Sequence, residues 1–159
     1  MSSEPVKIPL MSEDKIVYLL VDEEDFPKVS RFKWYLMHGY ARAENRRTTV
    51  SLARLVMGFP DLEIDHINRD KLDNRKANLR LATRRQNNMN AVHTQPGKYR
   101  GVSQRSKNSW RAAISVGTHP AKKYDAGGFG TPEEAALAYN ELARKYHGEF
   151  AILNDVPTI

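Results

Sequence analysis

The stretch from residue 61 to residue 90 restricts the fold of this chain more than any other part of it. Residues 63–66 alternate in side-chain character as a strand does, and a polar segment from Asn68 to Asn78 follows. Residues 79–82 alternate apolar and basic side chains, which indicates a second strand. Thr83-Arg84-Arg85-Gln86 forms a capping box, so a short helix is expected from Arg84 to about Met89. The expected order is therefore strand, loop, strand and helix.

Short strands are expected upstream of this stretch, within residues 6–50, where β-branched and aromatic residues alternate with turn residues. The expected strands are Ile16–Val21, Lys33–Tyr35, Tyr40–Arg42 and Thr48–Val50. The acidic segment 22–25 is expected to be a turn that ends the first of them. Ser51 is a suitable N-cap for a short helix over residues 52–57, which Gly58 and Pro60 end.

Residues 98–150 show a different pattern. Three strands are expected, over residues 98–103, 110–116 and 122–129. Thr131-Pro132-Glu133-Glu134 then combines a cap, a proline at the first helical position and a glutamate at the third, which is typical of a helix start. The apolar stripe of this helix is formed by Ala135, Ala138, Tyr139, Leu142, Ala143 and Tyr146. Its small alanines allow the helix to lie close to a sheet, and Gly148 ends it.

These patterns predict an α+β chain of two small modules. The first consists of a β-rich extension, residues 1–60, and a core, residues 61–92. Residues 93–97 are expected to be a linker. Residues 98–159 are expected to form the second module, a three-stranded antiparallel sheet packed on one helix.

The charge of the chain points to an anionic partner. The formal net charge is +6 and the pI is ≈ 9.6. Between Arg69 and Arg111 there are twelve Lys and Arg residues against two acidic ones, Asp70 and Asp73. Such a concentration favours nucleic acid. A membrane surface is the poorer alternative, because the chain has no basic amphipathic helix.

The compartment is constrained by what the sequence lacks. It contains no cysteine, which excludes disulfides and zinc–thiolate sites. Its first residues do not read as a signal peptide, and its longest apolar run, Ile16–Val21, is too short to span a bilayer. The expected location is the cytoplasm, with neither a membrane nor a small-molecule substrate as a partner.

Asp65, His66, Asn78 and Asn87 form the most informative set of polar residues. Phosphodiester hydrolysis needs a nucleophilic water, a base and a cation that neutralises the leaving oxyanion. The oxygen ligands of Asp65 and Asn87 suit Mg²⁺, and His66 is able to act as a base near neutral pH. Asn78, at the end of the loop, is expected to hold the imidazole by a hydrogen bond and fix its tautomer.

The same stretch resembles the ββα-metal motif of phage-type HNH homing endonucleases. The matching residues are Ile64–Asn68, Leu72–Arg75, Asn78–Arg80, Ala82-Thr83 and Gln86-Asn87, with a looser likeness over Arg54–Gly58. The resemblance implies that Asp65 and Asn87 bind one divalent ion, Mg²⁺ or Mn²⁺, that His66 is the general base and that Asn78 orients it. The chain has Ala53 where many members of the family have a histidine.

A second resemblance rests on residues of the second module, namely Tyr99–Val102, Arg105, Trp110–Ile114, Gly127, Phe129, Glu133–Ala136, Ala138-Tyr139, Gly148 and Leu153-Asn154. On these residues the module resembles the ethylene-response-factor (Apetala-type) DNA-binding domain of plants. This resemblance implies that the sheet contacts the major groove of DNA. Alternation places Trp110, Ala112 and Ile114 toward the helix and Arg111 toward DNA. The other candidate DNA-binding residues are Arg84, Arg85, Arg100, Arg105, Lys107 and Lys123.

This second module departs from the plant pattern at Ser103, Ser115 and Asp125, so the plant target sequence is not expected here. We expect a metal-dependent, homing-type endonuclease that acts on double-stranded DNA at sites selected by its C-terminal module. The alternative is a catalytically silent, sequence-specific DNA-binding regulator. A regulator of this kind has no physical need for the set Asp65, His66 and Asn87.

Overall fold

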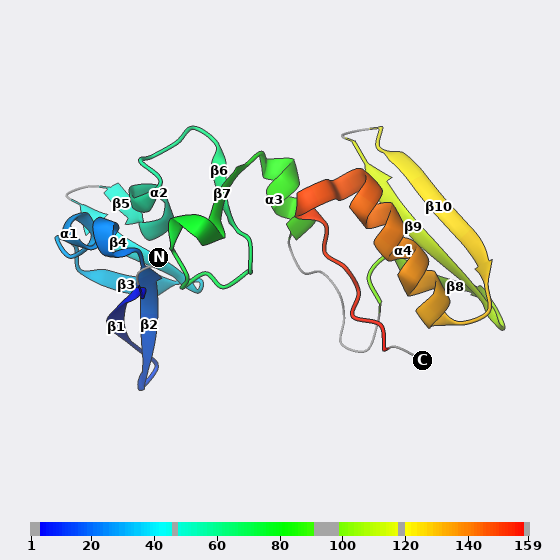
Figure 1. Cartoon of the computed structure of the whole chain (residues 1–159), viewed down its shortest axis with the longest axis horizontal. Coiled ribbons are helices and arrows are strands. Elements are labelled where there is room, and N and C mark those ends of the chain that lie inside the picture. The colour runs from blue at the N-terminus through cyan, green and yellow to red at the C-terminus, as the bar shows by residue number, and fades with distance from the viewer. Residues whose placement is uncertain (1–3, 46–47, 91–98, 118–119, 158–159) are drawn as a thin grey trace. The chain divides into compact units, whose positions relative to one another are not determined.

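The computed structural model describes residues 4–45, 48–90, 99–117 and 120–157 (Figure 1). The chain is a mixed α+β protein with small antiparallel sheets, as expected. It divides into two compact units, Met1–Asn87 and Asn88–Ile159. The expected linker, residues 93–97, lies outside the described residues, as does part of the expected turn at residues 118–120.

The first unit is built from two hairpins and a three-stranded sheet. The first hairpin pairs β1 (Val6–Ser12) with β2 (Lys15–Val21). The sheet has the order β3-β4-β5, with β3 (Trp34–Met37), β4 (Tyr40–Asn45) and β5 (Thr48–Ser51), and α2 (Leu52–Val56) follows it. The second hairpin consists of β6 (Glu63–His66) and β7 (Leu79–Ala82), with the 3-10 helix η2 (Lys76–Asn78) just before β7 and α3 (Arg84–Asn90) after it.

The segment after β2 is helical, and the expected turn over residues 22–25 is corrected accordingly. A 3-10 helix, η1 (Glu23–Asp25), leads into a short helix, α1 (Phe26–Val29). Pro27 lies in the first turn of α1, where a missing N–H has no cost. The buried carboxylate of Asp25 pairs with Lys28 at 2.7 Å and with Lys76 at 3.3 Å, so its charge is compensated.

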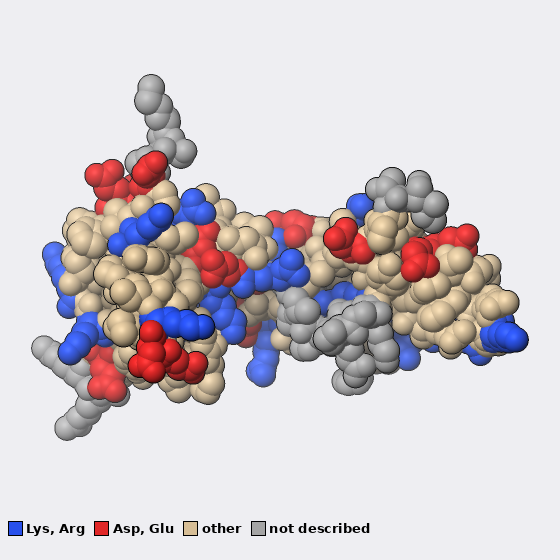
Figure 2. Space-filling view, turned by 90° about the horizontal axis from the view of Figure 1, so that it is seen from below, with Lys and Arg blue, Asp and Glu red and all other residues tan. Residues whose placement is uncertain are grey.

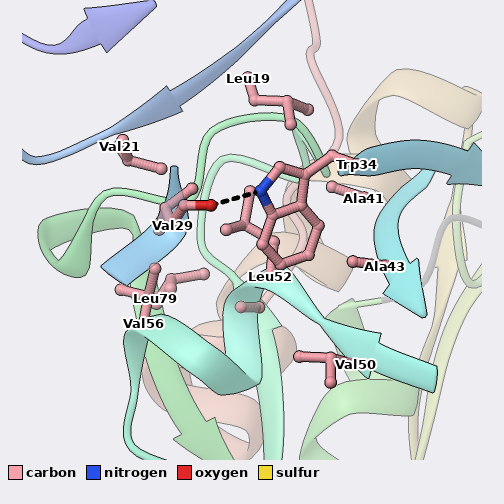
Figure 3. Close-up of a cluster of buried hydrophobic side chains, with 11 residues drawn as sticks. Leu19, Val21, Val29, Trp34, Ala41, Ala43, Val50, Leu52, Val56 and Leu79 are labelled. Carbon is pink, nitrogen blue, oxygen red and sulfur yellow. Dashed lines mark hydrogen bonds between the residues drawn. The ribbon is translucent and has the colours of Figure 1, made fainter. Parts of the chain in front are cut away.

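One hydrophobic core holds this unit together (Figure 3). Trp34 lies within it and its Nε1 donates a hydrogen bond of 2.9 Å to the carbonyl of Val29. Leu79 of β7 belongs to the same cluster, and Ile64 of β6 packs against it. The β6–β7 hairpin is therefore fixed to the core that the upstream strands build, which gives the polar ends of these strands a rigid support.

The second unit has the expected sheet packed on one helix. Its strands are β8 (Val102–Ser106), β9 (Ser109–Val116) and β10 (Lys122–Phe129), antiparallel in the order β10-β9-β8. The helix α4 (Pro132–His147) begins with the expected capping box and is followed by a 3-10 helix, η3 (Gly148–Phe150). Ala112 and Ile114 of β9 are buried against Tyr139 and Ala143 of α4, whereas Trp110 is only half-buried. None of the helices in the described part of the chain is long and apolar enough to cross a bilayer.

β8 begins at Val102, within the expected strand over residues 98–103, whose first residue lies outside the described part of the chain. Gly101 accounts for this start. Its φ of +69° is in the left-handed region, which side chains rarely adopt. A Cβ atom built on Gly101 would lie 2.1 Å from Cδ2 of Tyr139, so the chain passes against the helix at this point. A glycine is needed here both for the backbone conformation and for the close approach to α4.

We predict that Gly101→Ala destabilises the second unit by about 2–5 kcal/mol, because overpacking adds to left-handed strain. Gly128→Ala is the matched control, since Gly128 has a φ of +87° but no atom within 4 Å of its Cβ position. The control should lose only about 1–2 kcal/mol. Hydrogen exchange of peptides from residues 102–116 measures both effects. Equal losses in the two variants would contradict the packing against Tyr139.

Candidate active site

The β6–β7 hairpin and α3 bring the expected site residues into one part of the first unit. Asp65 and His66 end β6 and are both buried, with 5% and 6% exposure. Asp65 lies opposite Arg80 of β7, and His66 lies opposite Leu79. Only Thr83 separates β7 from α3, which carries Asn87. Two strands and a helix therefore position the expected residues on short, well-supported elements.

His66 is held by Asn74. Its Nε2 lies 3.2 Å from Oδ1 of Asn74, and Nδ2 of Asn74 donates to the carbonyl of Lys71 at 3.2 Å. Because the carbonyl of Lys71 accepts from the amide nitrogen, the amide oxygen is turned toward the imidazole. Asn74 therefore favours the tautomer with its proton on Nε2, which makes Nδ1 the basic nitrogen.

The surroundings of His66 keep its imidazole neutral. Burial lowers the pKa of His66 below its usual value of 6.5. The hydrogen bond to Asn74 and the carboxylates of Asp65, Asp70 and Asp73 act in the opposite direction without cancelling this effect. A neutral imidazole is the form that accepts a proton, so the site suits base chemistry near neutral pH.

Asn78 does not hold the imidazole, and that expectation is corrected. Its Oδ1 accepts from the backbone N–H of Asn68 at 3.0 Å, and its Nδ2 donates to the carbonyl of Asp73 at 2.7 Å. Its own carbonyl accepts from the N–H of Ile67 at 2.9 Å. Asn78 thus closes the loop between β6 and β7 at both ends, while Asn74, inside that loop, reaches the imidazole.

The loop between β6 and β7 is attached to the N-terminal hairpin. The N–H of Leu20 in β2 donates to the carbonyl of Leu72 at 2.9 Å, and the N–H of Asn74 donates to the carbonyl of Leu20 at 2.8 Å. Leu20 and Asp73 form a parallel β-bridge. The backbone position of Asn74 is therefore set by a strand more than fifty residues upstream.

Asp73 stabilises the inside of the loop. Nε and Nη2 of Arg75 donate to its two carboxylate oxygens at 2.7 Å each, and Nδ2 of Asn68 donates at 3.0 Å. The hydrogen bonds from Arg75 are the main reason that the pKa of Asp73 lies below its usual value. Bidentate pairing of this kind compensates a carboxylate whose side chain is 2% exposed.

Asp65 is paired with an arginine across the hairpin. Nε and Nη2 of Arg80 both contact Oδ2 of Asp65, at 2.8 and 2.7 Å. The Arg80 side chain is only 12% exposed, so the pair is largely shielded from water. This pair compensates the charge of Asp65 and holds its carboxylate in one orientation.

Asn87 is oriented by Glu63, a residue that the sequence pattern did not single out. Nδ2 of Asn87 donates to Oε2 of Glu63 at 2.8 Å. The expected capping box is present, since Thr83 and Gln86 bond each other's backbone N–H groups, at 2.8 and 3.3 Å. The N–H of Asn87 donates to the carbonyl of Thr83 at 3.0 Å, which places Asn87 in the first turn of α3.

The donor set fits a hard divalent cation in its chemistry. Asp65 and Asn87 offer only oxygen ligands, and Glu63 adds a second carboxylate beside Asn87. Within the described ranges there is no cluster of three His, Cys, Asp or Glu side chains of the kind that holds a metal through protein ligands alone. Mg²⁺ does not require one, because it keeps several waters and commonly uses one or two carboxylates. The residues present therefore fit Mg²⁺ better than zinc.

An aromatic ring lies near His66, and two cations lie against that ring. The ring of Tyr40 is 6.2 Å from the imidazole, centroid to centroid. Nζ of Lys71 lies 4.1 Å from the centre of the Tyr40 ring, and the guanidinium carbon of Arg42 lies 5.7 Å from it. Sequence reasoning missed this group because β4 and the loop are distant in the chain.

The expected DNA-binding residues differ in their surroundings. Arg84, Arg85, Arg105, Lys107 and Lys123 are exposed, and Arg111 is half-buried. Nε of Arg100 donates to the hydroxyl of Tyr139 at 3.0 Å, so this arginine makes a structural contact with α4. Figure 2 shows acidic and basic side chains close together on the face it presents, so the charge is not confined to one sign.

Arg80 and Asn74 carried no assigned role in the sequence, although both stand in the segments that resemble the HNH motif. The register of the hairpin was not predictable, because a twelve-residue loop leaves the strand pairing open. Once the register is known, the pairing of Asp65 with Arg80 follows from their opposite positions.

Comparison with known proteins agrees with the geometry. Residues 28–89 match the family model described as HNH endonuclease. The chain is 46% identical over 57 residues to the dehydration-responsive element-binding protein 2E of Oryza sativa subsp. japonica, a match that covers 36% of this chain and 18% of the plant protein. No solved structure matches the chain.

A viral relative extends over nearly the whole chain. It is an uncharacterized HNH endonuclease of Acanthamoeba polyphaga mimivirus, 32% identical over 160 residues, and the match covers 95% of this chain and 82% of the relative. HNH nucleases generally use a divalent metal ion and act on DNA. This relationship favours the nuclease over the alternative of a catalytically silent regulator. The chain therefore belongs to the HNH endonuclease family and is a nuclease hydrolase.

Proposed function

We propose that the first unit hydrolyses phosphodiester bonds of double-stranded DNA with one Mg²⁺ or Mn²⁺ ion, using His66 as the general base. The observation that carries this proposal is the buried, neutral imidazole of His66, oriented by Asn74 at 3.2 Å and placed next to Asp65. Structural histidines are common, but this one combines a fixed tautomer with adjacent oxygen ligands. That combination suits hydrolysis.

His66 takes a proton from the attacking water at Nδ1. The water oxygen forms a bond to phosphorus, the bond from phosphorus to one ester oxygen breaks, and the proton of the water is left on the imidazole. Nearby carboxylates then stabilise the imidazolium, since Asp65, Asp70 and Asp73 all raise the affinity of His66 for a proton. Asn74 keeps the ring from turning during the transfer.

Asp65 and Asn87 are the residues that would hold the metal. Bound there, a divalent ion supplies the positive charge that stabilises the phosphoryl oxygens and the leaving oxygen. Arg80 fixes the Asp65 carboxylate through Oδ2. Asn78 acts as a positioning residue, because it holds the loop that carries Asn74.

Cations around the site are proposed to bind the DNA backbone. Lys71 and Arg42 lie against the Tyr40 ring beside His66, and Arg84 and Arg85 are exposed on α3. Contacts of this kind fix the register of the strand and carry no base preference. They are expected to give a binding affinity that falls steeply with salt.

The second unit is proposed to select the site through the sheet face that points away from α4. Arg111 alternates with Ala112 and Ile114, which pack on the helix, so its side chain belongs to the opposite face. Arg111 lies opposite Ser103 and Gly127 in the two neighbouring strands, and a Cβ on Gly127 would lie 3.9 Å from Nη1 of Arg105. Arg105 and Arg111 therefore share this face.

A further basic side chain belongs to the same face. Lys123 lies opposite Ser115. Ser115 projects from the same face of β9 as Arg111, so Lys123 belongs to that face as well. Asp125, opposite Ala113, is the unfavourable charge on this surface, so we propose a preference different from that of plant domains.

The match to a plant protein named as element-binding supports the same assignment. A homing role in a phage or mobile element, with action in the cytoplasm of a bacterial host, belongs to this proposal. The relationship to a viral HNH endonuclease, over 95% of this chain, agrees with a viral setting.

We predict that His66→Ala lowers the rate of plasmid nicking by about 10²–10⁴-fold, the usual contribution of a general base, while DNA binding persists. The control is His38→Asn, because His38 is exposed with a φ of 52°, a conformation that asparagine tolerates. Nicking of supercoiled plasmid under single-turnover conditions gives both rates. If His66→Ala cleaved as fast as the control, another group would be the base.

We predict that Arg105→Ala combined with Arg111→Ala relaxes site preference, since each arginine that reads a base edge contributes about 1–3 kcal/mol of discrimination. Metal-dependent nicking of unrelated DNA should persist at high protein concentration. The matched control, Arg144→Ala with Lys145→Ala, removes the same charge from exposed positions of α4. Cleavage of a sequence library distinguishes them. Unchanged preference in the sheet variant would exclude this face as the reader.

A further inference from the structure

We propose that Glu63 is a positioning residue that fixes the amide of Asn87 with its carbonyl oxygen available to the divalent cation. This proposal rests on the proposed role of Asp65 and Asn87 as metal ligands. It starts from the hydrogen bond of 2.8 Å between Nδ2 of Asn87 and Oε2 of Glu63. Both residues are half-buried, so the bond is partly shielded from water.

The chemistry of the two partners decides which end of the amide faces Glu63. An asparagine amide presents a donor and an acceptor of nearly equal size, so shape alone does not select its orientation. The oxygens of a carboxylate accept hydrogen bonds and do not donate them. The nitrogen of Asn87 is therefore held on Glu63. Its Oδ1 accepts no hydrogen bond from any described residue, and only that oxygen is suited to bind a cation.

The position of Glu63 in the hairpin supports this role. Glu63 and Asp65 are two residues apart in β6, so they project from the same face of the strand. The backbone of Asn87 is fixed separately, because its N–H donates a hydrogen bond to the carbonyl of Thr83 in the capped first turn of α3. The hydrogen bond thus joins the helix that carries one proposed ligand to the strand that carries the other. A charged acceptor also strengthens the amide oxygen as a ligand.

A purely structural link between strand and helix predicts a different outcome for one substitution. Glu63→Gln keeps the length of the side chain and its ability to accept a hydrogen bond, so such a link would survive. Glutamine also donates, however, so the Asn87 amide is able to turn and present its nitrogen to the cation. In this variant the orientation of the Asn87 amide is lost, while a hydrogen bond between β6 and α3 remains.

The test measures the binding of Mn²⁺ to the full chain in the absence of DNA. The electron paramagnetic resonance signal of unbound Mn²⁺ reports how much of the ion is free. We expect Glu63→Gln to weaken binding by about 10-fold or more, the usual effect of removing a group that orients a ligand. Its urea unfolding midpoint should match that of the wild type. Glu133→Gln is the control for loss of a half-buried carboxylate, since Glu133 accepts a hydrogen bond from Tyr99 in the second unit.

A double-mutant cycle separates orientation from the charge of Glu63. If Glu63 acts through Asn87, Glu63→Gln should change binding by less than about 2-fold when Asn87 is already alanine. An equal loss with and without Asn87 would overturn the proposal, because the carboxylate would then act by its charge. Unchanged binding in Glu63→Gln would also overturn it.

Asp65→Asn distinguishes these outcomes from failure of the proposed metal site. If the wild type bound no Mn²⁺, or if Asp65→Asn bound it as well as the wild type, the proposed site itself would be wrong and the role of Glu63 would be rejected with it. If Asp65→Asn lost binding and Glu63→Gln did not, the site would stand and only the role of Glu63 would be rejected.

Discussion

The hydrogen bonds that join Leu20 to the loop after His66 are the constraint on which the active site depends. They fix the middle of the twelve residues between β6 and β7, whereas the pair of Lys76 with Asp25 fixes the end of this loop. Fixing a backbone costs about 1–2 kcal/mol per residue, so a polar loop of this length does not hold one conformation without outside contacts. The hydrogen bonds that Leu20 makes to Leu72 and Asn74, at 2.9 and 2.8 Å, fix which residues of the loop lie next to β2. Asn74 is then in place to orient His66, so the N-terminal hairpin is part of the catalytic unit.

Each buried carboxylate of the first unit has a basic partner, but these pairs have different roles. Asp25 pairs with Lys28 and Lys76, and the pair with Lys76 connects the end of the β6–β7 loop to η1. Asp73 pairs with Arg75 inside the loop. Buried pairs add little net stability, yet removing one partner leaves a costly charge, so both pairs enforce a single loop conformation. Asp65 differs because its partner, Arg80, holds a carboxylate that is proposed to bind a metal.

The sequence predicted the elements around the site better than their contacts. Alternation and the capping box located β6, β7 and the start of α3, because these depend on nearby residues. The start of α4 was predictable for the same reason.

The partner of His66 was not predictable. Asn74 and Asn78 are chemically identical, and only the folded loop shows which of them reaches the ring. The contact of Arg100 with Tyr139 likewise depends on packing at Gly101, which no local pattern indicates. The segment after β2 was misjudged because four acidic or polar residues suggested a turn, whereas lysines from elsewhere compensate the buried Asp25.

The central claim is that the first unit cleaves DNA through a hard divalent ion held by oxygen ligands. It is tested most directly by incubating the full chain with supercoiled plasmid after exhaustive treatment with EDTA, then restoring Mg²⁺ or Mn²⁺. We predict no cleavage in the chelated sample, and open-circle or linear product once either ion is restored, because Asp65 and Asn87 supply oxygen alone. Cleavage that persisted after chelation, or that required a thiophilic metal, would contradict the account.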